Sequence, residues 1–241
     1  MITVSNTNSR YNYYFYEMDT DSKMENVIET VMDNHSSIWV FGYGSLTWKP
    51  DFIYNTKEIG YIIGYQRRFW QGNVTHRGTI NKPGRVATLV ESKNDSLWGV
   101  AYEVVGRDYI LKALGYLNKR ETALGGYTTL VEDFYSRNGE LRKVLVYTAT
   151  SDNELYLGPC DMATMAMEIT TANGHAGSNV EYVIRLAEYV RKHIPEDNDV
   201  HLFTLEKYIC YLTQRRKTVE RNLSESIIAL TYDRLVDVVR T

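Results

Sequence analysis

This sequence of 241 residues contains little cysteine and lacks several motifs that commonly indicate a function. Only two cysteines occur, Cys160 and Cys210, so a disulfide framework is not indicated. No apolar run approaches the ~20 residues that a membrane-spanning helix needs. The N-terminus also lacks the basic and apolar regions of a signal peptide. These absences predict a cytosolic protein that has no membrane partner.

Catalytic and metal-binding motifs are scarce as well. The sequence has no His-Glu-x-x-His, no paired Cys-x-x-Cys and no histidine cluster at ligand spacing, so no metal site is indicated. A Gly-x-Ser-x-Gly elbow, which would indicate a hydrolase nucleophile, is also absent. Cys160 and Cys210 lie in or beside amphipathic segments, which favours packed thiols over nucleophiles. We therefore expect neither a metal nor another cofactor.

Neither sign of charge is in large excess. The formal net charge is −3, and the 44% hydrophobic and 24% charged residues are typical of a globular protein with a core. There is consequently no global electrostatic attraction to nucleic acid, and we expect no such partner. At this length the chain fits one domain with appendages, or at most two small domains.

The central feature of the sequence is a predicted strand followed directly by a glycine loop, over residues 40–46. Residues 38–41 are apolar, aromatic or β-branched, which suits a buried strand. Gly42 and Gly44 permit backbone angles closed to other residues, so successive N–H groups can turn towards one point. Such a concave group of amides binds an anion, and Ser45 adds a hydroxyl donor. The loop is neither a Walker loop nor a complete dinucleotide fingerprint.

Strands and turns dominate the chain up to about residue 148. Residues 1–36 are predicted to be a poorly ordered extension, although the aromatic cluster at 11–16 could dock on the domain or on a partner. Within 38–148 we predict two hairpins and one helix. The first hairpin pairs 84–91 with 97–105, the helix spans 107–118, and the second hairpin pairs 127–135 with 141–148.

Helices dominate after residue 160. Met162, Met165 and Ile169 share one helix face, on which the methionines are core filler. Ser178 has capping-box spacing at the start of the next helix, and Pro195 stops that helix. A further helix begins near residue 199, and the basic residues 214–217 separate it from a last helix over 223–239. The whole pattern predicts an α+β fold, an antiparallel-rich sheet or barrel with helices packed on it.

Among the carboxylates, Glu121 is distinguished by its setting. It follows a helix whose apolar face ends at Leu117, and it precedes the flexible turn at residues 125–127. A carboxylate at a helix end beside a glycine turn can point into a cleft. The competing interpretation is a surface glutamate that pairs with Lys119 or Arg120.

Arginines interleave with aromatic residues between positions 65 and 86. Such a stretch could bind single-stranded nucleic acid by stacking and phosphate contact, although no second basic stripe joins it. It could equally hold arginines that are paired inside the domain. A third interpretation is a positive wall for a small molecule that carries a carboxylate.

Motifs along the chain resemble, in this order, the glutathione-specific branch of the ChaC family of γ-glutamylcyclotransferases. The matching stretches lie at residues 39–46, 67–72, 76–78, 82–86, 97–102, 116–121, 125–127, 156–159, 179–182 and 201–206. The similarity covers roughly residues 38–212. It implies a catalytic domain at 37–212, between the N-terminal extension at 1–36 and a C-terminal helical extension at 213–241.

The resemblance also implies a fold, a substrate and site residues. The family fold is a small mixed β-barrel with helices packed around it. By resemblance Glu121 is the catalytic acid/base, and glutathione is the small-molecule substrate that is cleaved to 5-oxoproline and cysteinylglycine. The residues that bind its γ-glutamyl group are then Val40, Phe41, Gly42, Tyr43, Gly44, Ser45 and Leu46.

The chemistry of this reaction agrees with the residues independently. The α-amine of a γ-glutamyl amide can attack its own γ-carbonyl, so no catalytic serine or cysteine is required. One carboxylate of raised pKa can take a proton from the α-ammonium and protonate the leaving nitrogen. The loop amides can bind the α-carboxylate or the developing oxyanion, and both remain open. The alternatives are ring closure on other γ-glutamyl amino acids or amines, and a non-catalytic module with a protein partner that the sequence does not identify.

Overall fold

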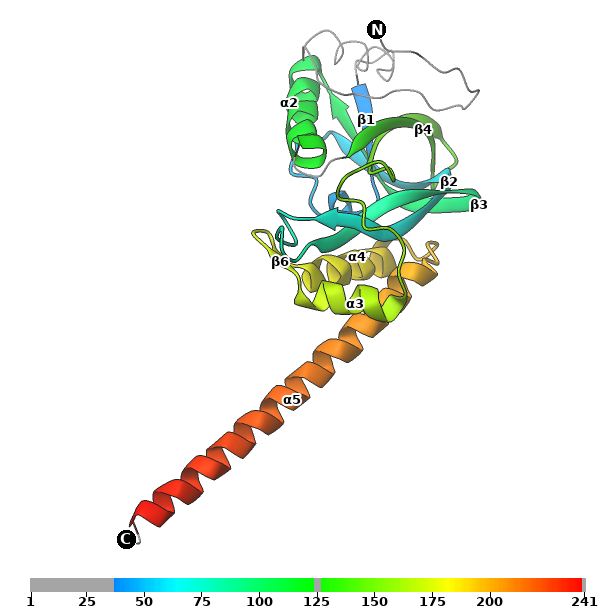
Figure 1. Cartoon of the computed structure of the whole chain (residues 1–241). Helices are drawn as coiled ribbons and strands as arrows, with labels where there is room; N and C mark the ends of the chain where they lie inside the picture. Colours follow the sequence, from blue (N-terminus) through cyan, green and yellow to red (C-terminus); the bar gives the residue numbers. More distant parts are fainter. Residues whose placement is uncertain (1–36, 124–126, 240–241) are drawn as a thin grey trace.

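Five strands form a closed barrel in the computed structural model, which describes residues 37–123 and 127–239 (Figure 1). The strands are β1 (Ser37–Gly42), β2 (Thr56–Asn73), β3 (Gly84–Val105), β4 (Thr128–Ser136) and β5 (Leu141–Thr148). Their order is β1-β3-β2-β4-β5, and β1 closes the barrel by pairing in parallel with β5. The predicted α+β barrel is confirmed. The predictions for residues 1–36 lie outside the described residues.

All six residues of β1 are buried, because β1 pairs with β3 on one side and with β5 on the other. Aromatic and β-branched residues suit this doubly paired position, as the sequence predicted. Inside the barrel, the ring of Phe41 lies 5.7 Å from the ring of Phe134 on β4. This packing fixes the point at which the glycine loop leaves the barrel.

The hairpin predicted within residues 84–105 is wrong. β3 runs through this range as one strand of 22 residues and pairs with β2, from Glu103 opposite Thr56 to Gly84 opposite Asn73. The turn-forming residues 92–95 instead occupy a register shift opposite Gly64 of β2. Asn and Asp are as compatible with a bulge as with a turn, so composition does not separate the two. The second predicted hairpin, formed by β4 and β5, is confirmed.

Three helices that come after β3 in the chain pack against that strand (Figure 1). They are α2 (Arg107–Leu117), α3 (Met162–Thr171) and α4 (Asn179–His193), and the short strands β6 (Asn173–Gly174) and β7 (Gly177–Ser178) join α3 to α4. Met165 is fully buried, as expected of core filler. The hydroxyl of Ser178 accepts from the Glu181 N–H and caps α4, which ends before Pro195. These local predictions are confirmed.

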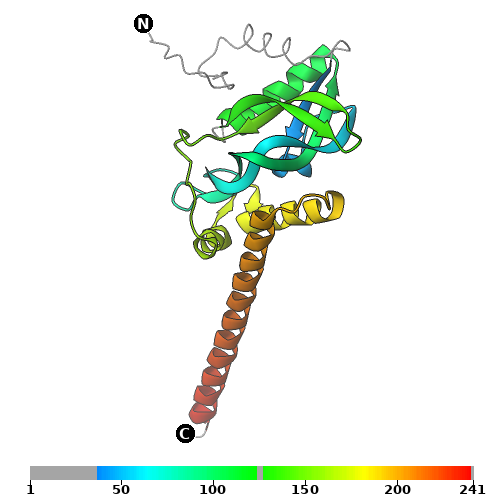
Figure 2. The same cartoon turned by 90° about the vertical axis from the view of Figure 1, so that its right-hand side faces the viewer.

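The last helix, α5, is continuous from Val200 to Val239. The break predicted at residues 214–217 is wrong, because residues 200–239 contain neither glycine nor proline and Arg216 forms an i, i+4 ion pair with Glu220 inside the helix. α5 packs against the domain at its start and then projects away from it (Figures 1 and 2). No helix in the described ranges has both the length and the apolar composition that a membrane span requires.

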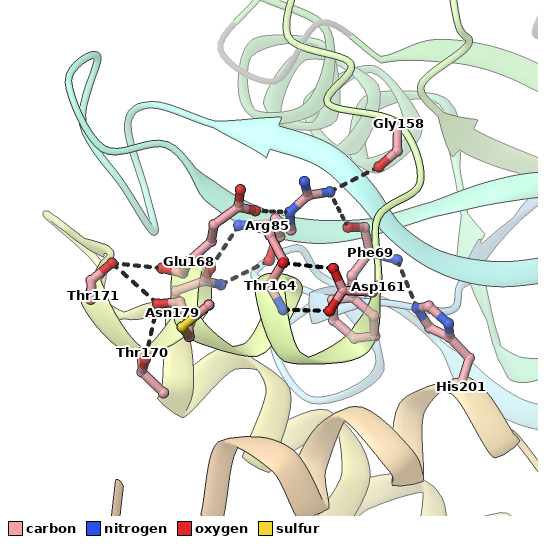
Figure 3. A network of polar contacts seen from close by, with 11 residues as sticks. Phe69, Arg85, Gly158, Asp161, Thr164, Glu168, Thr170, Thr171, Asn179 and His201 are labelled. Atoms are coloured by element: carbon pink, nitrogen blue, oxygen red, sulfur yellow. Dashed lines mark hydrogen bonds and ion pairs between the residues drawn. The ribbon is translucent and has the colours of Figure 1, made fainter. Parts of the chain in front are cut away.

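A polar network around Arg85 ties the helices to the barrel (Figure 3). The guanidinium donates to the carbonyl oxygens of Phe69 and Gly158, at 3.1 and 2.9 Å, and forms an ion pair with Glu168 of α3. The backbone of Arg85 exchanges two hydrogen bonds, of 2.6 and 2.8 Å, with the side chain of Asn179 of α4. Because Arg85 and Asn179 are buried, these bonds satisfy polar groups that water does not reach.

Three of the four arginines that the sequence interleaves with aromatics form ion pairs within the domain, and the fourth, Arg68, donates to the Arg67 carbonyl and to the side chain of Gln66. Arg67 is fully buried, and its Nη1 lies 3.2 Å from Asp197 and 2.8 Å from Asp199, in the segment between α4 and α5. Arg77 and Arg85 form ion pairs with carboxylates of α4 and α3. Internal pairing is therefore the interpretation that the structure supports, and these three cations are already neutralised.

Gly42 and Gly44 are needed for space, and Gly44 also for its backbone conformation. Neither has a positive φ, but Gly44, at φ −118° and ψ −130°, lies outside the main regions open to residues with a Cβ, as its predicted conformational role requires. A Cβ on Gly42 would lie 2.6 Å from the Cβ of Leu46, and a Cβ on Gly44 would lie 2.9 Å from the hydroxyl of Tyr182. The loop, which contains the short 3₁₀ turn η1 (Ser45–Thr47), thus folds closely against β1 and α4.

Arg67→Met should lower the free energy of unfolding by about 3–5 kcal/mol, since Asp197 and Asp199 would remain buried without their counter-charge. Urea denaturation measures this difference. The control is Arg137→Met, whose ion pair with Glu196 is about two-fifths exposed and which should cost about 1 kcal/mol or less. Equal losses in the two variants would contradict a structural role for the buried pair.

Gly44→Ala should lower the free energy of unfolding by about 1–3 kcal/mol, because the added methyl overpacks the contact with Tyr182. Gly44→Ala should cost less in a Tyr182→Phe background than in the wild type, because the oxygen that the methyl meets is then absent. The control is Gly115→Ala in α2, where no atom lies within 4 Å of the new methyl and a gain of about 0.5–1 kcal/mol is expected. A Gly44→Ala protein of wild-type stability would show that the loop is not close-packed.

Candidate active site

The structure brings the glycine loop and Glu121 together at one inner pocket, of about 30 Å³. Its lining comes from the loop, β3, β5, α4 and the turn that carries Glu121. The lining residues are Phe41, Tyr43, Gly44, Ser45, Leu46, Ala87, Glu121, Tyr127, Tyr147 and Tyr182. Two of the predicted loop residues, Val40 and Gly42, are not part of this lining, and Val40 is fully buried in the barrel core.

An outer cavity of about 320 Å³ adjoins the inner pocket. Both are lined by Ser45, Glu121, Tyr127 and Tyr182, so Glu121 stands where the two spaces meet. The outer cavity adds the cations Lys49, Lys119 and Arg120 and the carboxylate of Asp51, together with Arg77, whose charge is already paired with Glu181. Its walls therefore carry more positive than negative side chains, which favours an anionic guest.

Aromatic and histidine side chains complete the wall of the outer cavity. Trp48 meets Tyr182 edge-on, with ring centroids 5.5 Å apart, and its buried indole nitrogen has no hydrogen-bond partner among the described residues. His76, another lining residue, lies with its ring 4.7 Å from that of His175. The described part of the chain contains no group of three or more His, Cys, Asp or Glu side chains that could hold a metal ion.

Glu121 is positioned by a wide turn that prolongs α2. This turn, η2 (Asn118–Ala123), is a π-helix, a form that often occurs at functional sites. The backbone carbonyl of Glu121 accepts from the N–H of Tyr127 at 2.9 Å. Because the Glu121 side chain is only 15% exposed, its interpretation as a surface residue is wrong, although the ion pair with Arg120 is present.

Two opposing effects act on the Glu121 carboxyl. Burial raises the pKa of Glu121 above its usual range, and the positive charge of Arg120, whose Nε lies 2.9 Å from Oε1, opposes that rise. The contact is an ion pair without an aligned hydrogen bond, since no donor among the described residues is directed at Oε1. The carboxylate therefore keeps acceptor capacity for a proton that a ligand brings.

Four tyrosines surround Glu121, and for Tyr127, Tyr147 and Tyr182 the sequence predicted no site role. The hydroxyl of Tyr43 donates to the carbonyl oxygen of Tyr147 at 2.9 Å. Those of Tyr127 and Tyr182 bond to the backbone of β3, at 2.7 and 3.2 Å. Burial raises the pKa of all four tyrosines, to about 12 for Tyr182. Their hydroxyls therefore stay protonated and serve as hydrogen-bonding groups.

Comparison with known proteins agrees with the fold and the motifs. The sequence model of the family described as ChaC-like protein matches residues 38–211. Glutathione-specific γ-glutamylcyclotransferase 1 of Danio rerio is 47% identical over 180 residues, which cover 74% of this chain and 91% of the relative. Glutathione-specific γ-glutamylcyclotransferase of Schizosaccharomyces pombe is 36% identical, over 70% of this chain and 91% of the relative.

A solved structure shares the architecture. The crystal structure of a γ-glutamyl cyclotransferase specific to glutathione from yeast superposes with a TM-score of 0.68 at 28% identity, over 73% of this chain and 96% of the yeast chain. The family match covers the barrel, the glycine loop and the segment that carries Glu121. On these grounds the chain is a member of the ChaC-like family.

Proposed function

We propose that this protein is a glutathione-specific γ-glutamylcyclotransferase that converts glutathione to 5-oxoproline and cysteinylglycine. The observation that carries the proposal is the position of Glu121, a buried carboxylate where the glycine-loop pocket meets the outer cavity. Two relatives that carry the name of this activity are 47% and 36% identical to the chain over most of their length. The reaction class is a lyase reaction that splits a carbon–nitrogen bond.

The reaction needs proton transfer but no protein nucleophile. The α-amine nitrogen of the substrate bonds to its own γ-carbonyl carbon, and the bond from that carbon to the cysteine nitrogen breaks. The α-ammonium must lose one proton before the attack, and the same nitrogen must lose a second proton to become the lactam N–H. The leaving nitrogen gains one proton as its bond breaks and a second when it departs as the ammonium of cysteinylglycine. Glu121 accepts a proton from the attacking nitrogen and donates one to the leaving nitrogen, a task for which a raised pKa suits it, and the remaining proton is exchanged with water. The proton balance closes without a cofactor.

The glycine loop supplies groups for the negative charges of the substrate. Ser45 and Leu46 begin the η1 turn, so their N–H groups precede the first amide that is bonded within it, that of Thr47 to the Gly44 carbonyl. Together with the Ser45 hydroxyl, these amides can hold the α-carboxylate or the oxyanion that forms at the γ-carbon. Within the full predicted set, Val40 to Leu46, part of the action is through backbone groups. Val40 and Gly42 support the loop from behind.

The outer cavity suits the cysteinylglycine half of the substrate. That half ends in a carboxylate, and the surrounding walls carry an excess of cations. In this arrangement the γ-glutamyl group lies along the glycine loop, the scissile amide lies beside Glu121, and the glycine carboxylate faces the outer walls. We also propose that the catalytic domain spans residues 37–212 and that the protein is located in the cytosol.

Incubation of the purified protein with glutathione should release 5-oxoproline and cysteinylglycine in equal amounts. Glu121→Gln should lower kcat by about 10²–10⁴-fold with little loss of stability, since the amide keeps the shape but not the basicity. The matched control is Glu132→Gln, which changes another partly buried glutamate of raised pKa that lines neither the pocket nor the cavity. Wild-type turnover in Glu121→Gln would remove Glu121 from the mechanism.

Glutathione should be turned over with a kcat/KM about 10-fold or more above that of γ-glutamyl-alanine, because only glutathione fills the outer cavity. Side-by-side assays of the two substrates measure this ratio. Equal values would favour the alternative of a general γ-glutamyl cyclotransferase. A folded protein that turned over neither would favour the non-catalytic binding module.

A further inference from the structure

Arg120 lies between the glycine loop and Glu121 and contacts both. Its Nη2 donates to the hydroxyl of Ser45 at 2.6 Å, and its Nη1 donates to the backbone carbonyl of Lys49 at 2.9 Å. Its Nε lies 2.9 Å from Oε1 of Glu121. The side chain is only 14% exposed, so a largely desolvated cation makes all three contacts.

We propose that Arg120 is a positioning residue, which holds the Ser45 hydroxyl and the Glu121 carboxylate in one fixed geometry. The proposal rests on the proposed function in that Glu121 is taken as the acid/base. Ser45 follows β1 and Glu121 follows α2, so the two groups belong to separate elements. A planar guanidinium with several donors in a rigid fork can fix two such segments, which a single ammonium group cannot do.

The contact with Arg120 also decides what the Ser45 hydroxyl can do. Because the Oγ of Ser45 accepts from Arg120, its own proton is left to donate to another group. Ser45 lines both the inner pocket and the outer cavity. The hydroxyl is thereby prepared as a donor towards an anionic group of a bound substrate.

The charge of Arg120 acts on Glu121 as well. It opposes the effect of burial, so removal of Arg120 from an otherwise intact site should raise the pKa of Glu121 further. The other titratable groups that face Glu121 are the four tyrosines, which stay neutral. Arg120 itself is faced by Asp51, 3.8 Å away, and by the hydroxyl of Tyr116 at 3.4 Å, and Lys49, Lys119 and His76 share the cavity wall.

Two substitutions separate the charge of Arg120 from its geometry. Arg120→Met removes both, whereas Arg120→Lys keeps the charge and loses the fork. The control is Lys112→Met, which removes one positive charge from the exposed face of the same helical segment outside the cavity lining. The Glu121 carboxyl is titrated by ¹³C NMR on protein labelled at glutamate, and the signal is assigned by its absence in Glu121→Gln.

The titration should move to higher pH in Arg120→Met and stay near the wild-type position in Arg120→Lys and Lys112→Met. In the glutathione assay, kcat should fall by about 10²-fold in Arg120→Met and also fall in Arg120→Lys, since a small misplacement of reacting groups is costly. Ser45→Ala should cost less in the Arg120→Met background than in the wild type, because the two residues act together.

A wild-type titration and a wild-type kcat in Arg120→Met would overturn the proposal. If that variant does not fold, a folded Arg120→Lys decides the geometric part, and a wild-type kcat there would equally overturn it. An inactive wild-type protein would contradict the proposed function, whereas the NMR titration would still test Arg120 on its own.

Discussion

A carboxylate is stable inside a protein only where charge or hydrogen bonds offset the loss of water, and Glu121 is placed in such a position beside Arg120. The other parts of the site are arranged around the pair of Glu121 and Arg120. Closure of the barrel by β1 and β5 brings the glycine loop to the same end as the turn after α2. The tyrosines line the inner pocket beside the carboxylate, and since they are neutral they add no competing charge.

Features with a local cause could be predicted from the sequence. The buried strand at 38–41, the cap at Ser178 and the stop at Pro195 each depend on residues that are neighbours in the chain. The setting of Glu121, between an amphipathic helix and a glycine turn, allowed a cleft but on pattern alone favoured a surface ion pair. Its assignment as acid/base came from the motifs that the chain shares with a family, and not from that pattern alone.

Features that depend on distant partners were not visible in the sequence. Residues 92–95 have the composition of a turn, but they form a bulge because β3 pairs with the long strand β2 on both sides of them. Gly44 is required because Tyr182, far along the chain, leaves no room for a methyl group. Three of the four tyrosines around Glu121 had no predicted site role, because the sequence has 20 tyrosines and only the fold distinguishes these three. The ion pairs of Arg67 span 130 and 132 residues, which no local pattern records.

Trp48 gives the cavity an optical property of its own. Its indole lines the space that a ligand would enter, and its buried nitrogen has no partner among the described residues. The emission of an indole depends on the polarity and the hydrogen bonds around it. Occupancy of the cavity is thereby coupled to the intrinsic fluorescence of the protein, so that binding to an inactivated variant can be followed without a label.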